Sequence, residues 1–67
     1  MTIEQMKNIA KDYLNSEISY LADDLTTESK VCATLCAFLY VGLIPDDEYR
    51  EYCERIHQAE FKRISHS

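Results

Sequence analysis

Four of the residues whose side chains can bind a soft metal ion form two pairs with the same spacing: Cys32, Cys36, Cys53 and His57. Residues four apart lie on one face of a helix. In an antiparallel helical hairpin that turns at residues 42–45, Cys36 lies about 9 Å before the turn and Cys53 about 12 Å after it. The four side chains would then converge, and three thiolates with one imidazole form an ordinary closed zinc set.

Core packing is the interpretation of these four residues that we prefer, because structural zinc sites usually take cysteines with two residues between them (Cys-x2-Cys) and because free cysteine is commonly buried. A disulfide between Cys32 and Cys36 is disfavoured by the directions of side chains four apart on a helix. Cys53 and His57 lack a third orienting residue and a glycine-rich loop, which a nucleophilic pair needs. The sequence therefore predicts neither a catalytic residue nor a cofactor, with zinc at the four positions as the alternative.

The elements that would position these side chains are predicted to be helices. One glycine and one proline in 67 residues leave little room for the many turns of a small β-fold. We predict an all-α three-helix bundle in a single domain, residues 1–67, with helices at about 3–22, 28–41 and 46–64.

The first helix is expected to begin after Thr2, which forms a capping box with Gln5. A break at Asn15-Ser16 is an alternative, because both residues cap helices well. We favour an unbroken helix because an apolar stripe keeps its phase through that pair. The stripe consists of Ile3, Met6, Ala10, Leu14, Ile18, Leu21 and Leu25.

The second helix is predicted to start behind Thr26 or Thr27 and to end at Gly42, a residue suited to the left-handed position after a helix. Its residues 31–41 are apolar nearly all round, which is typical of a buried helix. Two helices of the same chain can hardly cover it. The pattern therefore predicts a buried central helix and a homodimer.

The third helix is predicted to follow Pro45, with a hydrophobic staple between Ile44 and Tyr49 and three acidic residues in its first turn. Residues 65–67 are expected to fray. The apolar side of this helix is expected to consist of Tyr49, Tyr52, Cys53, Ile56, Ala59, Phe61 and Ile64.

The turn between the second and third helices resembles a known family. Residues 42–49 read Gly-Leu-Ile-Pro-Asp-Asp-Glu-Tyr. This is similar to the turn of the short helical hairpins called SHOCT domains, and of many small helical proteins of Gram-positive bacteria and their mobile elements. The resemblance covers residues 35–56; Pro45 replaces the usual Ser or Thr cap, whereas Glu48 keeps the acidic residue of the capping box. The resemblance implies a hairpin used for oligomerisation or protein contact, not for catalysis.

Charge and aromatic residues indicate the kind of partner. The net charge is −5, from 12 acidic and 7 basic residues. A surface of this sign repels phosphate backbones and suits a basic protein. Tyrosines are enriched in protein interfaces. The predicted partner-binding residues lie at the start of the third helix: Asp46, Asp47, Glu48, Tyr49, Glu51 and Tyr52.

These observations predict a non-catalytic, acidic protein-interaction module that self-associates and acts as a regulator or inhibitor in a bacterial, phage or mobile-element context. An acidic face of this kind would occupy a basic nucleic-acid groove on another protein. One alternative is the zinc-binding protein, and another is a helix-turn-helix DNA-binding regulator with the third helix in the groove. The DNA-binding alternative places Asp46, Asp47 and Glu48 at the end of the helix that usually reads bases. We expect a cytoplasmic location, because no secretory signal is evident and the apolar run at residues 31–44 is shorter than the roughly 20 residues of a membrane-spanning helix.

Overall fold

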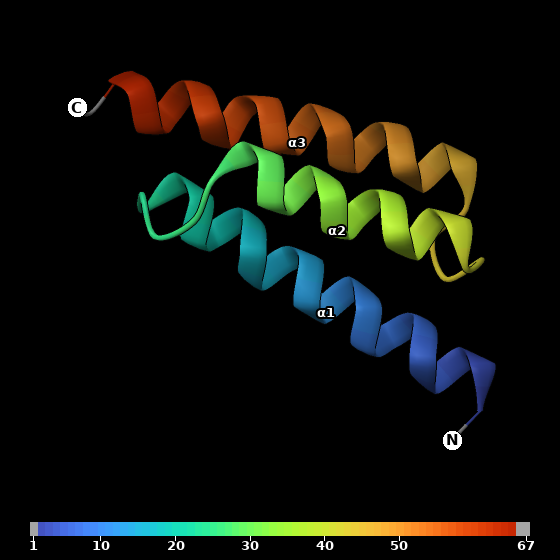
Figure 1. The fold of residues 1–67 in the computed structure, drawn as a ribbon. Helices are drawn as coiled ribbons and strands as arrows, with labels where there is room; N and C mark the ends of the chain where they lie inside the picture. Colours follow the sequence, from blue (N-terminus) through green and yellow to red (C-terminus); the bar gives the residue numbers. More distant parts are fainter. Residues whose placement is uncertain (1, 66–67) are drawn as a thin grey trace.

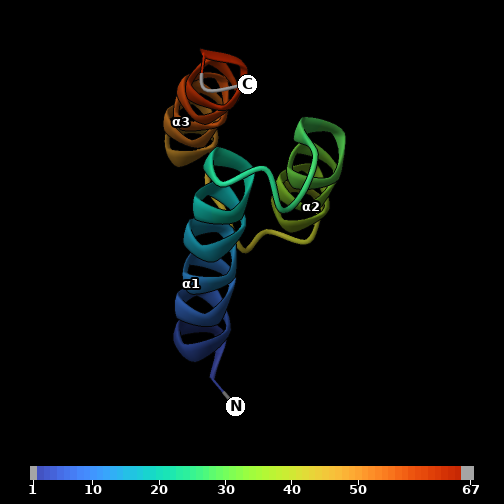
Figure 2. The same cartoon turned by 90° about the vertical axis from the view of Figure 1, so that its left-hand side faces the viewer.

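The computed structural model describes residues 2–65 and contains three helices: α1 (Ile3–Ala22), α2 (Glu28–Tyr40) and α3 (Asp46–Ser65). α1 and α3 run in the same direction and α2 runs opposite to both (Figure 1). Each helix contacts the other two, and the view along the bundle shows them at the corners of a triangle (Figure 2). The predicted all-α three-helix arrangement is confirmed. α2 ends one residue earlier than predicted and α3 one residue later.

The helix starts follow the local capping signals. The Gln5 amide donates to Thr2 Oγ1 over 3.1 Å, and the Thr2 amide donates to Gln5 Oε1 over 2.9 Å, which completes the predicted capping box. Thr27 is the residue that caps α2, because its Oγ1 accepts from the Lys30 amide. α1 continues without a break through Asn15-Ser16. Ser65 is the last residue of α3, and His66 and Ser67, where fraying was also expected, lie outside the described residues.

Two helices end in the same hydrogen-bonded motif. At the end of α2 the Gly42 amide donates to the Leu39 carbonyl and the Leu43 amide to the Phe38 carbonyl, while Gly42 has a φ of 82°. These are the two bonds of a Schellman motif. α1 ends with the equivalent pair of bonds, and there Asp24 takes the left-handed position with a φ of 63°. Asp is one of the few residues that occupy this region at moderate cost.

The start of α3 differs from the capping box implied by the hairpin resemblance. The Tyr49 amide donates to the Pro45 carbonyl, which makes Pro45 the residue that caps the helix. Proline has no amide hydrogen, so Glu48 has no reciprocal bond to accept. Glu48 instead forms an ion pair with Lys11 Nζ of α1 at 3.0 Å. The acidic residue therefore ties α3 to α1.

The core lies between the three helices and consists of nine buried residues: Leu14, Ile18, Leu21, Val31, Leu35, Ile44, Tyr52, Ile56 and Ala59. Ala10 is also buried but does not belong to this cluster. The predicted apolar stripe was wrong at its two ends, because Ile3 and Met6 at the start of α1 and Leu25 in the turn after α1 are exposed. Phe61 and Ile64, placed on the apolar side of α3 by the sequence, are exposed as well. The helix ends extend past the region where all three helices overlap.

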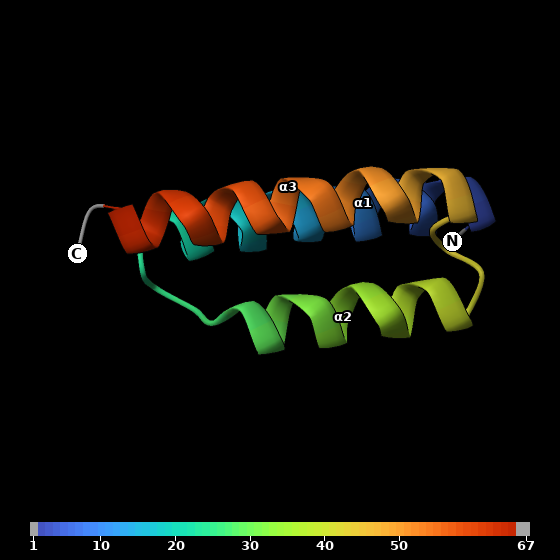
Figure 3. The same cartoon turned by 90° about the horizontal axis from the view of Figure 1, so that it is seen from above.

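The prediction of a buried central helix is wrong for the single chain. Within α2 only Val31 and Leu35 are buried, whereas Ala33, Ala37 and Tyr40 are exposed. α1 and α3 both pack on one side of α2, and its other side faces solvent (Figure 3). Composition alone showed no polar face, but the geometry of a three-helix bundle still leaves one side of each helix uncovered.

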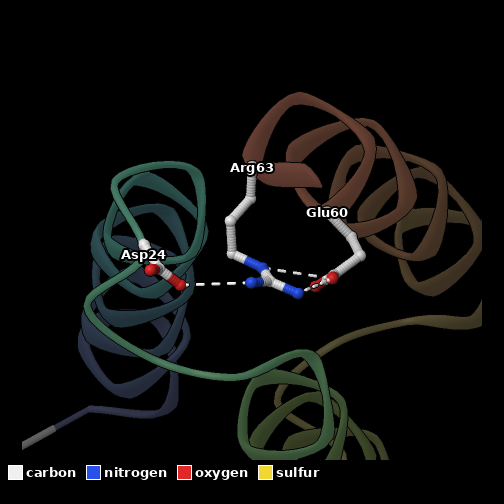
Figure 4. Close-up of polar contacts among 3 residues, drawn as sticks. All are labelled: Asp24, Glu60 and Arg63. Carbon is white, nitrogen blue, oxygen red and sulfur yellow. Dashed lines mark hydrogen bonds and ion pairs between the residues drawn. The ribbon is translucent and has the colours of Figure 1, made fainter. Parts of the chain in front are cut away.

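Arg63 connects the C-terminal part of α3 to the turn after α1 (Figure 4). Its Nη1 donates to Asp24 Oδ1 over 3.2 Å, and its Nε and Nη2 both donate to Glu60 Oε1. Hydrogen bonding to Glu60 and, to a smaller extent, to Asp24 raises the pKa of Arg63 above its ordinary value. Glu60 Oε2 is buried and has no hydrogen-bond partner among the described residues. The charge on Glu60 is therefore neutralised mainly through its other oxygen.

We predict that Gly42→Ala lowers the free energy of unfolding by about 1 kcal/mol, because a Cβ is disfavoured at a φ of 82°. No atom lies within 4 Å of the added Cβ, so backbone strain is the sole source of the loss. Urea denaturation measures it. Gly42→Asn is the matched control and should lose less, because Asn tolerates the left-handed region. An alanine variant as stable as the native protein would contradict this explanation.

We predict that Arg63→Met lowers the midpoint of thermal unfolding, because it leaves the Glu60 carboxylate shielded from water without its cation. Arg63→Met combined with Glu60→Gln should recover part of the loss. Arg50→Met serves as the control, since Arg50 is exposed on the same helix and no ion pair engages it in residues 2–65. Equal midpoints for the Arg63 and Arg50 variants would show that the Arg63 contacts do not stabilise the fold.

Candidate functional site

Some acidic residues at the start of α3 are exposed and unpaired in the described part of the chain, whereas Glu48 forms an ion pair. Asp46, Asp47 and Glu51 are exposed, and no ion pair engages them in the described part of the chain. Asp47 and Glu51 continue to Glu54, which is also exposed. The spacing of four and then three residues places these side chains along one side of α3. We call Asp47, Glu51 and Glu54 the acidic ridge.

The other predicted partner-binding residues lie elsewhere. Glu48 is engaged by Lys11, and Tyr49 is partly buried against the core. Tyr52 is a core residue, only 8% exposed, and the Arg55 guanidinium lies 5.4 Å from its ring centre. Tyr52 therefore does not belong to an accessible surface of the single chain. The acidic residues that face solvent are not accompanied by the two tyrosines that we expected beside them.

The three cysteines are partly buried where α2 faces α3. The Tyr49 hydroxyl lies 4.0 Å from Cys36 Sγ. Burial, followed by the negative charges of Glu28 and the other two cysteines, raises the pKa of the Cys32 thiol. His57 is exposed. Within residues 2–65 no group of three or more His, Cys, Asp or Glu side chains is placed to hold a metal ion, so the geometry gives the zinc alternative no support.

Tyr49 is the group most strongly affected by the thiols. Its hydroxyl hydrogen bonds to Cys53 and to Cys36 raise the pKa of Tyr49 to about 12, because ionising it would place an oxyanion against two thiolates. Tyr49 therefore keeps its proton above the ordinary tyrosine range, and its hydroxyl contact with Cys36 links α3 to α2.

An apolar groove that the sequence did not predict lies between the N-terminal half of α1 and the end of α2. Its volume is about 270 Å³. The Tyr13 and Phe38 rings meet edge to face in it, with centroids 6.1 Å apart. The residues that line it are Met6, Ile9, Ala10, Tyr13, Phe38 and Leu43. We call this the α1–α2 groove. The signal for it was the presence of Ile9 and Tyr13 directly beside the α1 stripe, which widens the apolar face on the α2 side.

None of the helices in residues 2–65 has the length and apolar character needed to cross a membrane. Comparison with known proteins found no matching family model, no matching curated protein and no matching solved structure. The resemblance of residues 35–56 to SHOCT-like hairpins thus depends on the turn residues alone.

We predict that replacing Cys53 and Cys36 by Ala returns the Tyr49 pKa from about 12 toward its ordinary value near 10. Spectrophotometric titration at 295 nm, compared with a Tyr49→Phe variant, isolates this tyrosine. Because the pKa is raised in the folded state, the unfolded state loses its Tyr49 proton first, so this group lowers the stability as pH rises from about 10 to about 12. Cys32→Ala is the control and should leave the titration unchanged. A Tyr49 that titrates near pH 10 in the native protein would contradict the assignment.

Proposed function

We propose that this protein is a non-catalytic protein-interaction module that binds a basic surface on another protein through the acidic ridge. The observation that carries the proposal is that three carboxylates, Asp47, Glu51 and Glu54, share one side of α3, face solvent and form no ion pair within residues 2–65. Neighbouring acidic side chains of the same bundle are used internally, as Glu48 is by Lys11 and Glu60 by Arg63.

The carboxylates of the ridge repel one another in the free protein. Like charges three or four residues apart on a helix destabilise it by about 0.2–0.5 kcal/mol per pair. Asp47 gains from its place near the positive N-terminal end of α3, but Glu51 and Glu54 lie beyond the first turn, where that effect falls off. A cationic partner surface would remove the repulsion and satisfy all three carboxylates together.

The spacing of the ridge defines the chemistry of the partner. Residues 47 to 54 extend over about 10 Å at the rise of an α-helix. A partner with two or three Lys or Arg side chains within that length is a suitable match, and a nucleic-acid-binding groove of a nuclease or regulator has this character. An acidic protein bound there would exclude nucleic acid and act as an inhibitor, which suits the bacterial or mobile-element context suggested by the hairpin resemblance.

We predict that reversing the ridge abolishes partner capture. The test variant carries Asp47→Lys, Glu51→Lys and Glu54→Lys, and the immobilised protein is incubated with a lysate of its source cells. The matched control reverses three exposed acidic residues of α1 and its C-cap, Glu4, Asp12 and Asp23, so that both variants have the same net charge.

The native protein and the α1 control should retain the same partner, the ridge variant should not, and the retained partner should elute at increasing salt because exposed charge pairs are screened. Equal capture by all three proteins would reject the ridge as the binding surface. Loss of capture in both variants would show that net charge, not the ridge, determines binding.

A further inference from the structure

The α1–α2 groove follows from a difference in helix length. α1 has 20 residues and α2 has 13, so α2 is seven residues shorter, or about 10 Å. α2 ends at Tyr40, and Leu43, just past Gly42, lines the groove together with Met6. The N-terminal half of α1 extends away from α2 and α3 at that end of the bundle (Figures 1 and 2). Its apolar side is left without a covering helix.

The exposed side chains there are large and apolar. Met6 is 40% exposed, Ile9 54% and Tyr13 51%. Ile3 precedes Met6 by one turn and Val41 precedes the Gly42-Leu43 turn, and both are more than half exposed. A typical monomer has a largest apolar patch of about 300–600 Å² that often serves a binding function. The groove volume, about 270 Å³, falls below the range of about 300–1,000 Å³ for small-molecule pockets and suits inserted side chains.

The distribution of charge identifies the occupant. No residue between Lys30 and Asp46 is charged, so the exposed side of α2, with Ala33, Ala37 and Tyr40, continues the uncharged surface of the groove. A chain with a net charge of −5 repels a second copy wherever carboxylates would meet. The N-terminal half of α1 adds two acidic residues, Glu4 and Asp12, and two basic residues, Lys7 and Lys11, so this face carries no net charge that would repel a second copy. It also offers no net charge by which a basic or acidic partner would be selected.

We propose that the groove is the contact face of a homodimer in which the N-terminal half of α1 of each chain packs onto the groove of the other, with Ile9 and Tyr13 at the centre. A twofold interface brings the same patch together on both chains, and an uncharged apolar patch is complementary to itself. A standard interface buries about 800 Å² per partner, which is about one sixth of the 4716 Å² surface of this chain. The groove provides the apolar centre, and the exposed side of α2 provides the rest. The acidic ridge lies on α3 and plays no part in this contact.

Native mass spectrometry and sedimentation analysis of the purified, reduced protein test the proposal. The native protein should show twice the chain mass of 7.8 kDa. Ile9→Glu should weaken the dimer by at least about tenfold, because it would place a carboxylate from each chain in the apolar centre. Phe61→Glu is the matched control and should leave the dimer unchanged, because Phe61 is 74% exposed on α3, away from the groove.

Circular dichroism establishes that the variants are folded. If Ile9→Glu does not fold, hydrogen exchange of the native protein at low and high concentration replaces it: amides of residues 6–13 and 38–43 should gain protection as the concentration rises. A native protein that remains a monomer at high concentration overturns the proposal and leaves the groove to a helix of another protein. A dimer that Ile9→Glu does not weaken overturns it too. The ridge variant should dimerise normally, so failure of the dimer and failure of ridge binding are separate results.

Discussion

The arrangement of this protein depends on one constraint: a helix of 13 residues lies against two helices of 20 residues. Apolar residues form the core where the three helices lie side by side. Apolar residues beyond that region stay exposed. Gly42 sets this limit, because its left-handed conformation and the two amide bonds of the turn end α2 and direct Ile44 into the core. The same turn fixes where α3 begins, and with it the level at which Glu48 meets Lys11. The groove and the exposed start of α3 both lie at this end.

The helices were predictable because their boundaries are encoded locally. Thr2 with Gln5, Thr27 and Gly42 each satisfy backbone groups within four residues of themselves, so sequence spacing determines their role. Burial is determined by neighbours that are distant in the sequence. Ile3 and Met6 keep the phase of the α1 stripe as faithfully as Leu14 does, yet they are exposed, because nothing in the local pattern states how far α2 extends beside them. The apolar stripe determines which side of α1 faces the core. How much of that side is buried depends on the length of the helix packed against it.

In the candidate sites too, some features follow from the local sequence and others depend on residues that are distant in the sequence. The exposure of Asp46, Asp47 and Glu51 follows from their charge. The burial of Tyr52 could be predicted from its spacing to Ile56 and Ala59, which lie four and seven residues later and are also buried. The sequence predicts Tyr52 both on the apolar side of α3 and on a binding surface, and its burial in the single chain agrees only with the first. Phe38 and Leu43 meet Met6 and Tyr13 only through the return of the chain, so the local pattern of α1 could indicate one wall of the groove but not the groove itself.

A chain this short must stay soluble although its small core leaves large apolar side chains exposed. A domain of this size buries only about 60% of the surface that its unfolded form exposes, so large apolar side chains remain outside the core. Net charge keeps such a protein dispersed but also opposes its association. Solubility and association are compatible when charge and apolar surface lie on different sides. Here carboxylates line the outer side of α3, while residues 31–45 contain no charge at all. This separation would let the chain cover its apolar face without giving up the negative charge on its other side.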